Sequence, residues 1–123
     1  MRDEKDKRID LRDRTKSFAL RIIKLYSSLP KSTEAQVIGK QILRSGTSVG
    51  ANYREAYRSR SDAEFISILG ICLKELEETT YWLELLNESN IVTLKKLELL
   101  LDECNQLIAI FTSIVITKKK NIS

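Results

Sequence analysis

Residues 41–56 read QILRSGTSVGANYREA, from Gln41 to Ala56, and this stretch decides the fold. Its apolar residues recur at helical spacing, yet Gly46 and Gly50 stand where a helix would favour alanine or leucine. Each interior glycine costs a helix about 1 kcal/mol relative to alanine. We expect that cost to be offset by a neighbour that packs very closely against this helix.

The same periodicity continues in both directions and predicts a helix over residues 34–59, with Thr33 as its N-cap. One face of this helix is predicted to enter the core, and it carries Ala35, Ile38, Ile42, Ser45, Val49, Tyr53 and Ala56. A flanking stripe is predicted to form a close helix packing or an interface, and it carries Gly39, Gly46, Gly50 and Tyr57. The sequence leaves open whether the close neighbour belongs to the same chain or to another subunit.

Three further helices are predicted, over residues 10–29, 62–88 and 94–118. The first ends before Pro30, because the residue before a proline is biased away from helical geometry. The third opens on a capping box from Ser61 to Glu64. Thr93 is the predicted cap of the fourth, whose core side is predicted to be Leu94, Leu97, Leu101, Cys104, Ile108, Phe111 and Val115.

Four helices joined by short loops predict an all-α fold, an antiparallel up-down four-helix bundle that forms a single domain over residues 1–123. The chain has one proline and four glycines, too few for the many turns of a sheet. The third and fourth helices carry more apolar residues than one buried face requires. This excess favours a contact between subunits.

The composition argues against an enzyme. The chain has no histidine, which removes the commonest general base and the commonest metal ligand. Its third helix is rich in glutamate, but a di-iron bundle would need paired Glu-x-x-His motifs. Cys72 and Cys104 are not spaced as a metal or redox motif and are expected to be buried, reduced thiols. We therefore predict no catalytic residues, no metal and no cofactor.

The beginning of the chain gives an expectation about location. It opens MRDEKDKR, a mixed-charge segment that is expected to be frayed and that does not resemble a signal peptide. No run of residues approaches the roughly 18 apolar residues of a membrane span. We expect a cytoplasmic protein without a membrane partner.

Charge is distributed unevenly along the chain. The net charge is +4 in total, but residues 1–60 carry +8 and residues 61–123 carry −4. A basic stripe on the second helix is predicted to bind the backbone of RNA or DNA, and it comprises Lys40, Arg44, Arg54 and Arg58, with Arg60 nearby. Two alternatives remain, a solvated face and a face paired with glutamates of a neighbouring helix.

Three other residues of the second helix have predicted roles near this stripe. Tyr57 lies off the stripe and is placed where it could stack a base. Asn52 and Glu55 lie between the core face and the basic stripe. Half-buried polar side chains need hydrogen-bond partners, so we expect these two residues to join a polar network, either within the chain or across an interface.

Two stretches carry a resemblance to a known family. QILRSGTSVGANYREA at residues 41–56 resembles the signature of the four helix bundle protein family, also called ribosomal-RNA intervening-sequence proteins. The segments AEFI at residues 63–66 and KELEETTYWLELL at residues 74–86 are similar to the same family. The resemblance covers about residues 10–117.

This resemblance implies an antiparallel four-helix bundle that assembles into a ring, typically a homopentamer. It also implies a relationship to the accessory variability protein of diversity-generating retroelements, which is thought to bind nucleic acid and a reverse transcriptase. No enzymatic activity is attached to the family. We therefore expect a non-enzymatic oligomer that binds RNA or DNA, with a protein-interaction scaffold as the alternative.

Overall fold

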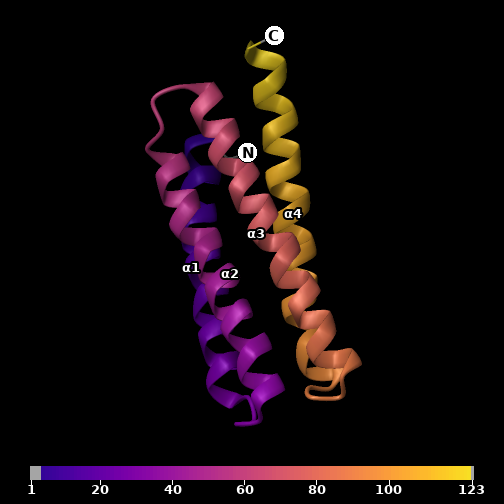
Figure 1. The fold of residues 1–123 in the computed structure, drawn as a ribbon. Coiled ribbons are helices and arrows are strands. Elements are labelled where there is room, and N and C mark those ends of the chain that lie inside the picture. The colour runs from indigo at the N-terminus through magenta and orange to yellow at the C-terminus, as the bar shows by residue number, and fades with distance from the viewer. Residues whose placement is uncertain (1–3, 123) are drawn as a thin grey trace.

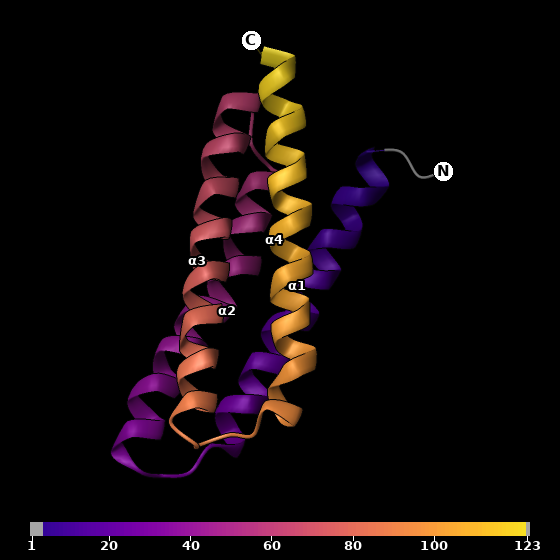
Figure 2. The same ribbon diagram turned by 90° about the vertical axis from the view of Figure 1, so that its right-hand side faces the viewer.

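The computed structural model describes the backbone of residues 4–122 and the side chains of residues 11–122. These residues form four helices and no strand: α1 (Glu4–Ser28), α2 (Thr33–Tyr57), α3 (Asp62–Glu88) and α4 (Leu94–Ile122). Consecutive helices run in opposite directions and are joined by short connections (Figure 1). A quarter turn shows α3 and α4 side by side, with the C-terminal part of α4 extending past the N-terminal end of α3 (Figure 2). The fold is all-α, with an up-down arrangement of its helices.

Three of the helices begin or end at residues that differ clearly from the predicted bounds. α1 begins at Glu4 rather than at residue 10, so most of the segment expected to fray is helical, while residues 1–3 lie outside the described part. α2 ends at Tyr57, because Arg58 leaves helical geometry with φ of −99° and ψ of 8°. α4 continues to Ile122 past its lysines, because nothing in residues 118–122 breaks a helix.

The helix caps explain two of the starting points. Ser32, and not Thr33, caps α2, because its hydroxyl accepts a hydrogen bond from the backbone N–H of Ala35 over 3.3 Å. Ser61 caps α3 as predicted and accepts from the N–H of Glu64 over 3.1 Å. The Glu64 carboxylate reaches back one residue further than a standard capping box, to the N–H of Arg60.

The core runs along the length of the bundle, and side chains from all four helices fill it. At one level, the rings of Tyr53 from α2 and Phe111 from α4 stack with centroids 5.5 Å apart. The predicted core face of α2 is buried apart from Ile38, which is half-buried, and α1 buries Leu11, Phe18 and Ile22. α2 packs against both α1 and α3, whereas α1 and α4 contact each other only over a short stretch.

The predicted core face of α4 is partly wrong. Leu97, Cys104 and Phe111 are buried as expected. Leu100 and Leu107 are buried in place of their neighbours Leu101 and Ile108, whereas Val115 is half-buried and Leu94 is 53% exposed. The buried face of α4 is rotated about the helix axis relative to the predicted face, because α4 packs chiefly against α3. A row of apolar residues therefore remains at the edge of the core.

Within residues 4–122, α4 is the one helix long and apolar enough to cross a membrane, with a mean hydropathy of 1.6 over its most apolar 18-residue window. This differs from the prediction made from uninterrupted apolar runs, because polar residues interrupt the apolar run of α4. Core helices of bundles pass the same test when they are mostly buried, and 22% of this window of α4 is buried inside the bundle.

Candidate functional site

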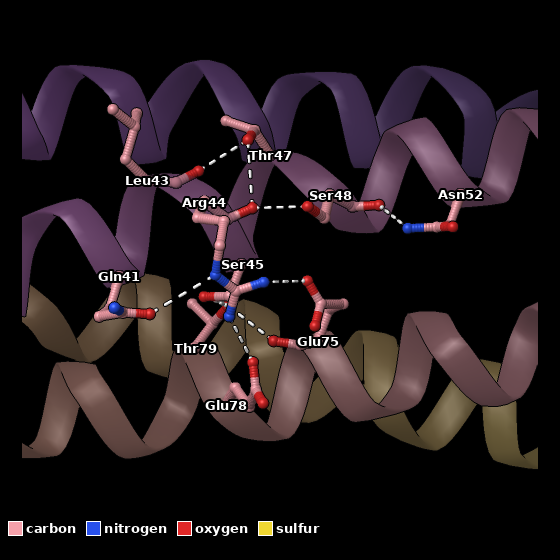
Figure 3. Close-up of polar contacts among 10 residues, drawn as sticks. All are labelled: Gln41, Leu43, Arg44, Ser45, Thr47, Ser48, Asn52, Glu75, Glu78 and Thr79. Carbon is pink, nitrogen blue, oxygen red and sulfur yellow. Dashed lines mark hydrogen bonds and ion pairs between the residues drawn. The ribbon is translucent and has the colours of Figure 1, made fainter.

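Arg44, a member of the predicted basic stripe, is held by two glutamates of α3 (Figure 3). Its Nη1 donates to Glu75 over 3.0 Å and its Nη2 donates to Glu78 over 2.6 Å. The Arg44 side chain is 51% exposed, whereas that of Glu75 is only 10% exposed. Arg44 therefore links α2 to α3, and much of its charge is neutralised within the chain.

The electrostatics of this cluster follow from its hydrogen bonds. The bond from Arg44 holds the pKa of the Glu78 carboxyl below its usual value. Reciprocally, the bond to Glu78 raises the pKa of the Arg44 guanidinium. At neutral pH the cluster consists of a cation bonded to Glu78 as a carboxylate, which leaves Arg44 less able to attract an outside phosphate.

The polar side chains around Arg44 form hydrogen bonds with residues of α2 and α3. The hydroxyls of Ser45 and Thr79 lie 2.7 Å apart and join α2 to α3 in the buried interior. The amide of Asn52 donates to the backbone oxygen of Ser48 over 2.8 Å (Figure 3). Glu55 is exposed and has no hydrogen bond or ion pair with any described residue. The predicted network of Asn52 with Glu55 is therefore absent from the described residues, and the α2–α3 network is built from other residues.

The four other predicted cations are exposed. Lys40 and Arg54 lie on α2, Arg58 caps its end and Arg60 lies in the loop to α3. Among residues 11–122, none of these four side chains forms an ion pair. Their charges are available to an anionic partner, in contrast to that of Arg44.

The glycine stripe of α2 faces α1 of the same chain. A Cβ atom built on Gly39 would lie 2.6 Å from a methyl of Leu29, and one on Gly46 would lie 2.7 Å from Cγ1 of Ile22. A Cβ on Gly50 would lie 3.3 Å from the backbone oxygen of Thr15. The close neighbour is thus a helix of this chain, and the glycines give no support to a subunit contact at this stripe.

Tyr57 lies at the end of the same stripe. The guanidinium of Arg12 from α1 lies over its ring, 4.6 Å from the centroid. This cation–π contact covers the ring face on the α1 side and stabilises the pairing of α1 with α2. Base stacking on that face would require Arg12 to move.

Two surface grooves flank α2, and neither was predicted from the sequence. The first lies between α1 and α2, has a volume of about 280 Å³ and is lined by Lys16, Ala19, Thr47, Gly50, Ala51 and Arg54. The second lies between α2 and α3, has a volume of about 400 Å³ and is lined by Gln41, Arg44, Lys74, Glu77, Glu78, Tyr81 and Trp82. Helical spacing does not predict that Lys16 lies near Arg54. That prediction would also require the angular register of α1 against α2.

The thiols and carboxylates of the described residues lie in ordinary structural surroundings. Burial raises the pKa of the Cys72 thiol to about 12 and that of the Cys104 thiol to about 11. Both cysteines are free and buried. In the part of the chain that the structure describes, no group of three or more Cys, Asp or Glu residues could hold a metal ion.

Comparison with known proteins then decides the family. The family model described as 23S rRNA-intervening sequence protein matches residues 7–113. The chain belongs to this family. A similar solved structure is that of a protein with unknown function from the S23 ribosomal protein family of Bacteroides thetaiotaomicron. It is 42% identical with a TM-score of 0.83, and the match covers 89% of this chain and 97% of that one. No curated protein matches this sequence.

Proposed function

We propose that this member of the 23S rRNA-intervening sequence protein family is a non-enzymatic, oligomeric bundle that binds RNA or DNA through the exposed cations of α2 and the loop after it. The observation that carries the proposal is the set of cations that form no ion pair with described residues: Lys40, Arg54, Arg58 and Arg60. Binding of this kind is electrostatic and largely independent of sequence. The protein acts in the cytoplasm, and a nucleic-acid enzyme such as a reverse transcriptase is its proposed second partner.

Assembly into a homopentameric ring is part of the same proposal. It is supported by apolar side chains of α4 that the bundle leaves in solvent: Leu94, Leu99, Ile116 and Ile122, each more than half exposed. Burying these side chains against a neighbouring subunit would be favourable, because it removes apolar surface from water. A ring would place several copies of a small basic surface side by side and multiply a weak affinity for a long nucleic acid.

A protein-interaction scaffold without a nucleic-acid role is the second candidate. One observation favours it: Arg44 is already bonded to Glu75 and Glu78, so one predicted nucleic-acid contact is used inside the chain. In a scaffold, the remaining cations would contact the acidic surface of a neighbour. Subunit association, rather than RNA affinity, would then weaken as salt is raised.

The deciding experiment measures binding of the full chain to labelled RNA and DNA between about 50 and 300 mM salt, a range over which phosphate contacts weaken steeply. A variant with Lys40, Arg58 and Arg60 changed to glutamine tests the surface. The proposal expects salt-sensitive binding that is reduced in the variant. Absence of binding at the lowest salt, or equal binding by both proteins, would reject it. Light scattering on the same samples tests the ring, and a 14 kDa particle would reject it.

A further inference from the structure

We infer that the groove between α1 and α2 is where a nucleic-acid strand lies, with its phosphates held between Lys16 and Arg54. This inference rests on the proposed function and deepens it by naming the contact. α1 and α2 lie side by side along the bundle, so the groove follows the seam between them (Figure 1). Lys16 was not part of the predicted basic stripe, because it belongs to a different helix.

The lining of the groove has the chemistry that a phosphodiester backbone needs. Lys16 lies on the α1 side and Arg54 on the α2 side, and neither forms a hydrogen bond or ion pair with a described residue. Among residues 11–122, no carboxylate lines the groove. Two cations at a groove whose described lining contains no anion attract a polyanion at close range.

The shape of the groove agrees with this charge. Small side chains complete its lining, those of Ala19, Thr47 and Ala51, together with Gly50. The Thr47 hydroxyl donates to the backbone oxygen of Leu43 over 2.6 Å and so stays close to its own helix. A strand can therefore approach the surface of α2 without meeting a long side chain, and a volume of about 280 Å³ leaves room between the two cations.

The other groove of α2 is less suited to a polyanion. It carries Arg44 and Lys74, but also Glu77 and Glu78, and Arg44 is already bonded to Glu78. Glu75 and Glu78 are paired within their own chain and would not reach the α1–α2 groove of a neighbouring copy.

The test compares two double variants with equal loss of charge. Lys16→Ala/Arg54→Ala removes the groove cations, whereas Lys95→Ala/Lys96→Ala removes two exposed lysines of α4. A third variant, Ala51→Leu, fills the groove without changing charge. The probe is a fluorescein-labelled oligouridine of about 20 nucleotides, longer than most single-strand sites. Its affinity for the full-length proteins is measured by anisotropy over a series of salt concentrations.

We expect the groove double variant to bind more weakly and to lower the slope of log affinity against log salt by about 1.4, since each phosphate contact on a single strand contributes about 0.7. Ala51→Leu should weaken binding as well, and the α4 variant should behave as the wild type does. The emission of Trp82, the single tryptophan, should not change on binding, because it lines the other groove.

Each contrary result overturns a different claim. If the wild type binds but the groove and α4 variants bind equally well, the groove is not the site and the proposed function stands. If Trp82 emission is quenched and the groove variants keep their affinity, the strand lies between α2 and α3. If the groove variants change only the assembled mass, the groove is a subunit contact. If the wild type does not bind at about 50 mM salt, the proposed function fails together with the groove.

Discussion

Arg14 of α1 and Glu103 of α4 form a two-point ion pair across the seam between the first and last helices. Nε of Arg14 donates to Oε2 of Glu103 over 2.8 Å, and Nη2 donates to Oε1 over 2.8 Å. The hydrogen bond with Glu103 raises the pKa of the Arg14 guanidinium. Because α1 and α4 contact each other only over a short stretch, this fork-shaped pair holds the last helix to the first.

Replacing Glu103 with glutamine should therefore weaken the contact between α1 and α4 and lower the stability of the protein. Glu103→Gln keeps the shape of the side chain but removes its charge, and the pair is partly exposed, so we expect a loss of about 1 kcal/mol in the free energy of unfolding. Urea denaturation measures the change. Glu98→Gln, at an exposed position of the same helix, is the matched control and should have no effect. Equal stability of the two variants would show that the pair contributes nothing.

The glycines of α2 and α3 should respond to alanine in opposite directions. At Gly46, an added Cβ would lie 2.7 Å from Cγ1 and 2.9 Å from Cγ2 of Ile22, and a β-branched side chain in a helix has little freedom to move. Gly46→Ala should destabilise the protein by about 1–3 kcal/mol, as overpacking of a core does. Gly39→Ala should cost less, because the nearest atom is a terminal methyl of Leu29.

Gly70 of α3 provides the control, because nothing lies within 4 Å of an added Cβ there. Gly70→Ala should stabilise the protein by about 0.5–1 kcal/mol through helix propensity. Thermal unfolding of the three variants ranks them. A Gly46→Ala protein as stable as the wild type would mean that α1 and α2 are further apart in solution than they are here.

Helical periodicity was enough to locate the helices, because each has an apolar face repeated over many turns. It could not predict the ends at Glu4 and Ile122, since polar residues there neither extend an apolar face nor break a helix. It also misjudged Leu101 and Ile108. Their burial depends on which neighbours surround α4, and the lateral packing of α4 is not encoded in its own period.

The candidate site was harder to predict than the fold. The sequence identified Arg54 as a surface cation, but not its position opposite Lys16 across a groove. It grouped Arg44 with the free cations, whereas this residue is bonded to Glu78 over 2.6 Å. Both outcomes depend on the angular register between helices, which is set by contacts such as that of Gly46 with Ile22.

The two cysteines should be inert in the native protein. With pKa values of about 12 for Cys72 and about 11 for Cys104, roughly one thiol in a thousand or fewer is ionised at pH 8. A thiol reagent such as DTNB should label neither residue on the time scale of free cysteine, and both promptly in urea. Rapid labelling of Cys104 alone would reveal local opening of α4 from α3.

The bond between Arg44 and Glu78 should make stability depend on pH in acid. The pKa of Glu78 is lowered from its ordinary 4.5, so the unfolded chain binds more protons than the folded chain as the pH falls below that value. The stabilisation is complete above about pH 4.5 and is lost as the pH falls through the lower folded pKa.

Arg44→Gln removes the cause of the shift. Its deficit in the free energy of unfolding should therefore be largest near pH 7 and should shrink as the pH falls below the ordinary pKa of 4.5, as followed by urea denaturation. Arg58→Gln, at an exposed cation without an ion pair to a described residue, should show no such change with pH. A deficit for Arg44→Gln that stays constant across the acid range would mean that the guanidinium stabilises the bundle by packing rather than by its charge.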